Sequence, residues 1–179
     1  MKRYIITGTP GSGKTTILGA LKNAGYPVVS EAATDVISRE QALGNPEPWR
    51  SPQFIDQIVE LQLLRQLESD YKQDGIHFFD RSPFCTHALA KYLQYDPSSL
   101  LKKELDRVIR NGVYEKRVFF LNNLGFVTPT EARRITFEEA LTFEAIHRES
   151  YEEFGFECMN IPAVSVDLRM DLILGAICS

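Results

Sequence analysis

The chain has little cysteine, no excess of positive charge and no long apolar run. Its three cysteines, Cys85, Cys158 and Cys178, lie far apart and show no CxxC spacing, so we expect neither disulfides nor a structural zinc site. Lysine and arginine total 20 against 24 acidic residues, and the net charge is −4. Because proteins that coat nucleic acid are usually basic, we expect no nucleic-acid partner.

The sequence also lacks the patterns of membrane-spanning and exported proteins. No stretch reaches the roughly 18 consecutive apolar residues that predict a membrane-spanning helix. The N-terminal apolar stretch Tyr4-Ile5-Ile6 is far shorter than the roughly 7 to 15 apolar residues at the centre of a signal peptide. We therefore expect a cytoplasmic protein with no membrane contact and with reduced cysteines.

Strand-like and helix-like segments alternate along the chain. This alternation is typical of an α/β fold in which helices cover both faces of a parallel sheet, a three-layer αβα arrangement. With 179 residues, against about 150 in a common domain, and no long linker, we expect one domain over residues 1–179. The expected strands lie near 2–7, 26–31, 75–82, 116–124 and 155–163, and the helices near 13–24, 32–43, 53–72, 84–94, 98–111, 137–154 and 165–177.

The segment 53–72 has the clearest helical period. Its apolar residues recur at spacings of three and four, which places them on one face of a helix. They are Phe54, Ile58, Leu61, Leu64, Leu67 and Tyr71.

The first expected strand runs directly into the loop GTPGSGKTT and then into a helix. The loop matches G-x-x-x-x-G-K-[ST] at every fixed position. Glycines let backbone N–H groups converge on phosphate oxygens, and the start of the helix favours negative charge. A glycine-rich turn with an incidental lysine is the alternative, but a strand before and a helix after are what the motif requires. We expect a nucleotide to bind at Gly8, Thr9, Pro10, Gly11, Ser12, Gly13, Lys14, Thr15 and Thr16.

Asp80 ends an apolar strand, IHFFD, and Arg81 follows it. Ligands of parallel sheets bind at the carboxyl ends of the strands, so Asp80 and the Thr15 hydroxyl are expected to hold Mg²⁺. Capping of the next helix is the alternative for Asp80. Arg81 stands where many ATPases carry an acidic residue, and it suits a protein that stabilises a moving phosphoryl group. A structural salt bridge is the alternative for Arg81.

Glu31 ends the second expected strand in VVSEAA. That end faces the same crevice as Asp80, so Glu31 is expected to accept a proton from a substrate hydroxyl or to orient it. The alternative is a glutamate at the start of the next helix, where it would be favourable with the helix dipole.

A polar segment between the fourth strand and the long helix carries the paired Arg133 and Arg134. We interpret residues 126–139 as a lid whose arginines reach the transferring phosphoryl group. A solvated charge pair at a helix start is the alternative. Weaker signals come from His77, which we expect in the core, and from Trp49, which either covers a substrate pocket or anchors at the surface. His87 and His147 lie in helices and have no acidic partner at a telling spacing.

Four segments together resemble a known family: GTPGSGKTT, VVSEAA, FFDRS and the C-terminal YEEFGFECMNIPAVSVDLRMDLIL. They are similar to small proteins labelled AAA-type ATPases that look like nucleoside and nucleotide kinases. Ribosylnicotinamide kinase domains and, more distantly, deoxynucleoside kinases share this plan. The resemblance implies a P-loop NTPase fold with five parallel strands in the order 2-3-1-4-5. It also implies the catalytic set Lys14, Glu31, Arg81 and Arg133 or Arg134.

The chain departs from this family at two positions on the expected substrate side. Thr34 stands where relatives often have an arginine, and Cys85 stands where they tend to have an aspartate. Both changes leave the identity of the substrate open, and they do not affect the expected ATP site.

The expected function is transfer of a phosphoryl group from ATP, with Mg²⁺, to a hydroxyl of a small, nucleoside-like acceptor. ATP is favoured over GTP because no N-K-x-D pattern follows the fourth strand. The alternative is a regulatory ATPase that hydrolyses ATP slowly to control a protein partner. The acceptor and the oligomeric state stay undetermined at this stage.

Overall fold

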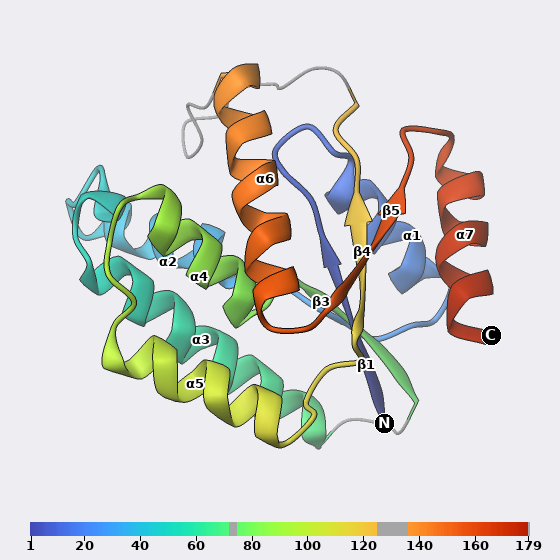
Figure 1. Ribbon diagram of the computed structural model, residues 1–179, viewed down its shortest axis with the longest axis horizontal. Coiled ribbons are helices and arrows are strands. Elements are labelled where there is room, and N and C mark those ends of the chain that lie inside the picture. The colour runs from blue at the N-terminus through green and yellow to red at the C-terminus, as the bar shows by residue number, and fades with distance from the viewer. Residues whose placement is uncertain (72–74, 125–135, 179) are drawn as a thin grey trace.

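The computed structural model describes residues 1–71, 75–124 and 136–178. Its strands form one parallel sheet in the order β2-β3-β1-β4-β5, which confirms the expected order and the α/β class (Figure 1). The strands are β1 (Lys2–Thr7), β2 (Val28–Val29), β3 (Ile76–Asp80), β4 (Arg117–Leu121) and β5 (Glu157–Ile161). The helices are α1 (Lys14–Asn23), α2 (Ala32–Ala42), the 3-10 helix η1 (Pro48–Arg50), α3 (Gln53–Asp70), α4 (Pro83–Tyr92), α5 (Ser99–Arg110), α6 (Phe137–Glu153) and α7 (Val166–Cys178).

The central strands are buried on both faces, which is why they read as continuous apolar runs. Successive residues of a strand point to opposite faces. Ile5 of β1 and Phe79 of β3 pack on the side of α3, α4 and α5, whereas Ile6 and Phe78 pack on the side of α1 and α7. Figure 1 shows α1 and α7 on one side of the sheet and α3, α4 and α5 on the other.

The register of the sheet places the chemistry at one edge. Ile6 of β1 pairs with Asp80 of β3, and the chain enters the loop at Gly8 two residues later. Thr7 of β1 pairs with Phe120 of β4, so the loop emerges between two strands that end beside it. Asp80 therefore lies at the carboxyl edge of the sheet, next to the start of the loop.

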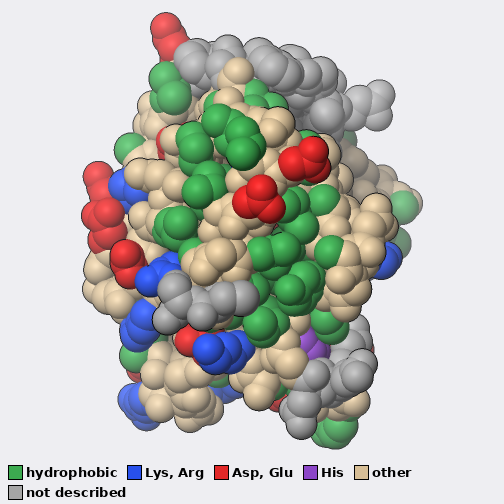
Figure 2. Space-filling view, turned by 90° about the vertical axis from the view of Figure 1, so that its right-hand side faces the viewer, with side chains coloured by type: hydrophobic (Ala, Val, Ile, Leu, Met, Phe, Trp, Pro, Cys, Tyr) green, Lys and Arg blue, Asp and Glu red, His purple; other side chains and the backbone are tan. Residues whose placement is uncertain are grey.

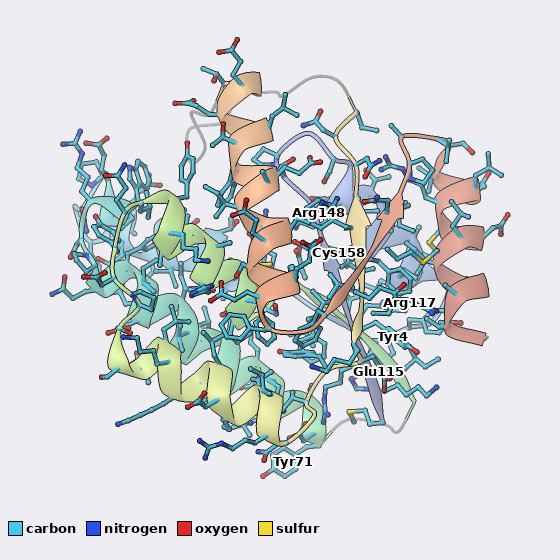
Figure 3. All side chains as sticks on the ribbon, in the orientation of Figure 1. Tyr4, Tyr71, Glu115, Arg117, Arg148 and Cys158 are labelled. Carbon is cyan, nitrogen blue, oxygen red and sulfur yellow. The ribbon has the colours of Figure 1, made fainter. Side chains whose placement is uncertain are left out.

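Helix α3 begins at the expected residue and ends at Asp70, two residues before the expected end, and the apolar residues that the spacing places on one face are not all buried. Phe54 and Ile58 are buried, whereas Leu64, Leu67 and Tyr71 are 52%, 44% and 92% exposed. Tyr71 points away from the body of the molecule at the end of α3 (Figure 3).

Polar contacts explain why the buried face of α3 turns along its length. The second half of the helix buries Gln66 and Ser69 instead of leucines. Gln66 accepts a hydrogen bond from Arg107 of α5 at 2.6 Å and donates to Asp70. Because this contact between α3 and α5 is polar, the spacing of apolar residues does not reveal the face of α3 that packs against α5.

Helix α7 buries one face against α1 and the sheet and leaves apolar side chains on the other. Ile173 and Ile177 belong to the core, whereas Leu168 and Leu172 are exposed. The face of the molecule on the α7 side accordingly shows hydrophobic side chains between charged ones (Figure 2).

His77 is fully buried within β3, as expected for a core histidine. Cys85 and Cys158 are free thiols. Within the described ranges, none of the helices combines the length and the apolar character needed to cross a membrane.

Candidate phosphate and acceptor site

The phosphate loop is possible only because several of its residues lack a side chain. Gly8 has φ +154°, and a Cβ there would lie 2.8 Å from the carbonyl oxygen of Leu121 and 2.7 Å from Ser12 Oγ. Gly13 has φ +75° and stands at the N-cap of α1. Residues other than glycine rarely adopt such angles, so the local backbone explains the glycines of the motif.

The start of α1 presents a row of unused amides. The first backbone hydrogen bond of α1 runs from Ile17 N–H to the Gly13 carbonyl, at 3.2 Å. Among the described residues, the N–H groups of Lys14, Thr15 and Thr16 donate to no backbone carbonyl. Such orphan donors at a helix N-terminus form a site for an anion.

Lys14 and Asp80 form a buried ion pair beside the loop. The Lys14 side chain is 8% exposed and that of Asp80 is 12% exposed. Burial, followed by the nearby charge of Arg81, lowers the pKa of Lys14 below its ordinary value. Burial also raises the pKa of Asp80, against the opposing effect of Lys14. Burial thus disfavours the charged form of each partner, and a bound ligand that carries charge would change this balance.

The residues suit a magnesium ion. Asp80 bonds Lys14 through Oδ1, and in the described part of the chain its Oδ2 has no hydrogen-bond partner. Thr15, next to Lys14 on the first turn of α1, is exposed. Mg²⁺ prefers oxygen ligands and is commonly held by one or two protein groups together with substrate phosphates. Asp80 does not cap α4, because Ser82 occupies the N-cap position.

Glu31 and Arg81 form a second ion pair, 2.6 Å between Glu31 Oε1 and Arg81 Nε. The other carboxylate oxygen of Glu31 accepts a hydrogen bond from Thr34 at 2.9 Å. Glu31 occupies the N-cap position of α2, but its side chain does not cap the helix. The departure at Thr34 therefore contacts one of the expected catalytic residues.

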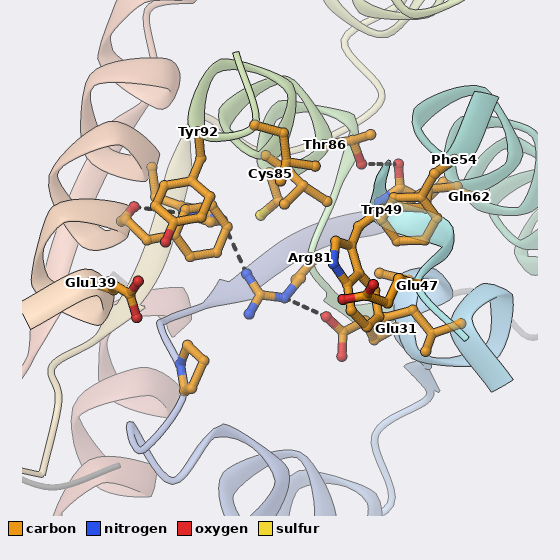
Figure 4. A pocket seen from close by; sticks show the side chains of 18 residues that line it. Glu31, Glu47, Trp49, Phe54, Gln62, Arg81, Cys85, Thr86, Tyr92 and Glu139 are labelled. Atoms are coloured by element: carbon orange, nitrogen blue, oxygen red, sulfur yellow. Dashed lines mark hydrogen bonds and ion pairs between the residues drawn. The ribbon is translucent and has the colours of Figure 1, made fainter. Parts of the chain in front are cut away.

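The Arg81 guanidinium makes further contacts that fix its position. Its Nη2 donates to the Gly8 carbonyl at 3.0 Å, and its Nη1 lies 3.0 Å from Nε2 of His147 (Figure 4). Burial alone would lower the pKa of Arg81, but the negative charge of Glu31, above all, raises it beyond its ordinary value. The backbone of Arg81 has φ +71°, a left-handed conformation that costs an L-residue about 1–2 kcal/mol. Strain of this kind is typical of functional sites.

A pocket of about 350 Å³ lies beside the Glu31–Arg81 pair and reaches the phosphate loop at Pro10 (Figure 4). Most of its wall is apolar, with a few polar groups, which is typical of sites for small organic molecules. Trp49 belongs to this wall. The structure therefore favours a position at a pocket over the alternative of a surface anchor. The lining residues are Pro10, Glu31, Ala33, Ile37, Glu47, Trp49, Phe54, Ile58, Gln62, Arg81, Cys85, Thr86, Leu89, Tyr92, Leu93, Glu139, Phe143 and His147.

Gln62 is a polar residue of the pocket wall that lies among aromatic side chains. Its Oε1 accepts a hydrogen bond from Thr86 Oγ1 at 2.9 Å, which fixes the orientation of the amide. In the described part of the chain no partner accepts from its Nε2. The amide can therefore donate to a ligand in the pocket.

The sequence reasoning missed His147 as a member of the site, and it placed Cys85 on the expected substrate side only through the family resemblance. His147 of α6 is 1% exposed, and its Nδ1 lies 3.0 Å from the Phe143 carbonyl. Cys85 contacts the hydroxyl of Tyr151 at 2.9 Å and that of Thr7 at 3.3 Å. Burial would raise the pKa of the Cys85 thiol, but a hydrogen bond and charge from His147 and the charge of Arg81 lower it to about 6. No spacing along the sequence indicates either residue, because each is placed by packing between distant helices.

The lid is mostly beyond what the structure describes. Arg133 and Arg134 lie outside the described residues, as does the rest of 126–135. Helix α6 begins with a capping box, in which Glu139 N–H donates to the Thr136 hydroxyl and Thr136 N–H donates to Glu139. Glu139 also lines the pocket, so the start of α6 borders the expected acceptor.

Comparisons with known proteins agree with this geometry. A family model described as an AAA domain matches residues 3–169. An adenylate kinase from a Nitratiruptor species is 31% identical over 126 residues, which span 65% of this chain and 65% of that relative.

Solved structures of deoxyadenosine kinase from M. mycoides share the fold. The structure with bound dATP has a TM-score of 0.58 at 16% identity and covers 99% of this chain and 100% of that chain. The structure with the products dCMP and dCDP has a TM-score of 0.63 at 17% identity, with 98% of each chain covered. At this identity the likeness shows the fold alone, which the chain shares with these deoxyadenosine kinase structures.

Proposed function

The chain belongs to the AAA domain family, and on that premise we propose that it transfers a phosphoryl group from ATP to a hydroxyl of a small, nucleoside-like molecule. The observation that carries the proposal is the position of one ion pair. Glu31 and Arg81 line the pocket, and Arg81 also donates to Gly8 at the start of the phosphate loop. A group bound in the pocket and a phosphate bound by the loop would therefore meet at this pair.

The loop supplies the phosphate side of the reaction. The amides at the start of α1 and the ammonium of Lys14 bind the oxygens of the triphosphate, and a moving phosphoryl group needs such charge compensation more than covalent chemistry. Thr15 and Asp80 would hold Mg²⁺, which neutralises charge on the phosphates when it is bound.

The Glu31–Arg81 pair supplies the acceptor side. The Glu31 carboxylate pairs with the Arg81 guanidinium and lines the pocket, where it can accept the proton of an acceptor hydroxyl. Arg81 is fixed by Gly8 and His147, so it can hold Glu31 in place and contact the transferring group. An acceptor bound in the pocket would displace water, which would otherwise compete as the acceptor.

The pocket also favours a kinase over a regulatory ATPase. A protein that only hydrolyses ATP needs no cavity of about 350 Å³ beside the expected γ-phosphate. Four aromatic side chains and the Gln62 amide suit a flat ring with hydrogen-bonding edges. The names of the similar proteins, an adenylate kinase and deoxyadenosine kinases, agree with an acceptor that contains a nucleoside.

The test is release of ADP from MgATP in the presence of single nucleosides and related hydroxyl compounds. We expect one acceptor to stimulate release many-fold. Glu31→Gln should lower turnover by about 10²–10⁴-fold, the usual contribution of a general base, while the affinity for MgADP stays unchanged. The matched control is Glu153→Gln, an exposed glutamate paired with Lys91 far from the loop. ATP turnover that no acceptor stimulates, or normal transfer by Glu31→Gln, would contradict the proposal.

A further inference from the structure

Arg169 is a buried cation that contacts the phosphate loop from behind. It lies in the first turn of α7 and is 2% exposed. Its Nη1 donates to the Ser12 carbonyl at 2.6 Å, its Nε to the Pro162 carbonyl at 2.7 Å, and its Nη2 to the Asn122 carbonyl at 3.3 Å. Among the described residues it forms no ion pair. The guanidinium thus joins the loop to the ends of β4 and β5.

Arg169 is one of several donors that form hydrogen bonds with carbonyl groups on the outer side of the loop. Asn123 Nδ2 donates to the Pro10 carbonyl at 3.0 Å, and Leu124 N–H donates to the Gly11 carbonyl at 3.1 Å. With the Ser12 carbonyl held by Arg169, three consecutive carbonyls of the loop are bonded on its outer side.

The orientation of these carbonyls decides where the loop amides point. In a planar trans peptide the C=O of one residue and the N–H of the next point in opposite directions, and the described chain has no cis peptide bond. The bond from Arg169 to the Ser12 carbonyl therefore turns the Gly13 N–H away from Arg169. In the described part of the chain that N–H donates to no other group, so it is free to bind a ligand in line with the amides of α1.

A buried guanidinium without a carboxylate is costly unless another negative charge approaches it. Burial lowers the pKa of Arg169, so the protein holds this charge against its desolvation. The guanidinium also lies close to Gly13, where a Cβ would be 3.3 Å from Nη1. The opposite side of that thin loop is where the amides converge.

We propose that Arg169 is a positioning residue of the phosphate loop: it fixes the Ser12–Gly13 peptide so that the Gly13 amide faces the nucleotide phosphates, and its charge favours their binding from behind. The inference rests on the proposed nucleotide binding. It adds a residue that lies more than 150 positions from the loop in the sequence. It also gives a reason for the close contact of α7 with α1.

The test compares Arg169→Met and Arg169→Lys with a matched control, Arg117→Met. Arg117 Nη1 donates to the Ala176 carbonyl at 2.6 Å, so it too ties a strand to α7 by an arginine–carbonyl bond, but at the end of α7 away from the loop. Binding of MgADP and of magnesium tripolyphosphate is measured by calorimetry, and thermal unfolding is recorded for each variant. Tripolyphosphate has no base, so it reports on the phosphate loop alone.

We expect Arg169→Met to weaken both probes by roughly 10–100-fold, which corresponds to loss of a hydrogen bond from a charged group. Arg169→Lys should lie between it and wild type, because an ammonium keeps the charge but cannot hold three carbonyls. Arg117→Met should bind as wild type does. In steady-state kinetics the KM for ATP should rise while the KM for the acceptor stays unchanged.

Three results would separate the possible failures. Folded Arg169→Met that binds both probes as wild type does overturns the inference. If that variant does not fold, Arg169→Lys decides in the same way, with equal binding overturning it. Wild-type protein that binds neither MgADP nor magnesium tripolyphosphate overturns the proposed function itself.

Discussion

The phosphate loop and the acceptor pocket meet at Arg81, yet they are built from different materials. The loop is a short run of consecutive residues, and the backbone amides at the start of α1 after it are unused among the described residues. The pocket is made of side chains from η1, α2, α3, α4 and α6, with walls from residues as far apart as Pro10 and His147. On the proposed function, the loop would recognise charge, which every nucleotide carries, and the pocket would recognise shape. Changes in one should leave binding at the other intact.

The largest effect that would sharpen this comparison is expected at Lys14. Lys14→Ala removes the cation paired with Asp80 and should lower kcat/KM by about 10²–10³-fold, similar to the loss of one preorganised donor. Because Lys14 does not line the pocket, acceptor binding measured by calorimetry should stay at the wild-type value. A matched control is Lys91→Ala, which removes an exposed ion pair with Glu153. If Lys14→Ala weakened nucleotide binding and acceptor binding equally, the loop and the pocket would not be separate sites.

The loop was predictable from the sequence because its chemistry is local. Consecutive glycines, a lysine and a hydroxyl are needed wherever amides must converge on phosphates, so the order of residues carries the signal. Asp80 and Glu31 were also found, because the ends of parallel strands share one edge of the sheet. The structure brings Lys14 to Asp80 and Glu31 to Arg81, although their chemical roles stay predictions.

The pocket was not predictable, because packing decides it. Gln62 looks like a surface residue of α3 until α4 places Thr86 against it. His147 contacts Arg81 and Arg169 bonds Ser12, and in each case the two residues are more than 60 positions apart in the sequence. The exposed Leu64 and Leu67 show the same limit, because apolar spacing places residues on one helix face but does not tell which of them packing will bury.

An intermediate effect is expected at Gln62. Gln62→Leu removes the amide that Thr86 orients and should raise the KM of the acceptor by roughly 10–100-fold, the cost of leaving polar groups of a ligand unpaired. The affinity for MgADP should not change, because Gln62 lies in the pocket and not in the loop. Steady-state kinetics with the acceptor and ATP varied separately measures both values.

The control for Gln62 is another glutamine of the same helix. Gln57 donates to Glu40 at 2.8 Å and does not line the pocket. Gln57→Leu should therefore leave both KM values as they are in wild type. If Gln62→Leu instead weakened MgADP and the acceptor alike, the two regions would be one coupled site.

The last effect concerns stability rather than binding and is expected at Cys85, where pocket and sheet edge touch. The native pKa of about 6 lies below the pKa of about 8.5 of an unfolded thiol, so the unfolded chain binds more protons between these values. Stability should therefore rise with pH across this interval and be lost again as pH falls through the native pKa. Denaturant unfolding of wild type and Cys85→Ser at several pH values measures the difference. Cys158, whose pKa burial raises to about 11, provides the control, because Cys158→Ser should not remove a rise across neutral pH. If Cys85→Ser keeps the full rise, the thiolate is absent, and the charge that balances Arg81 on the pocket side comes from Glu31 alone.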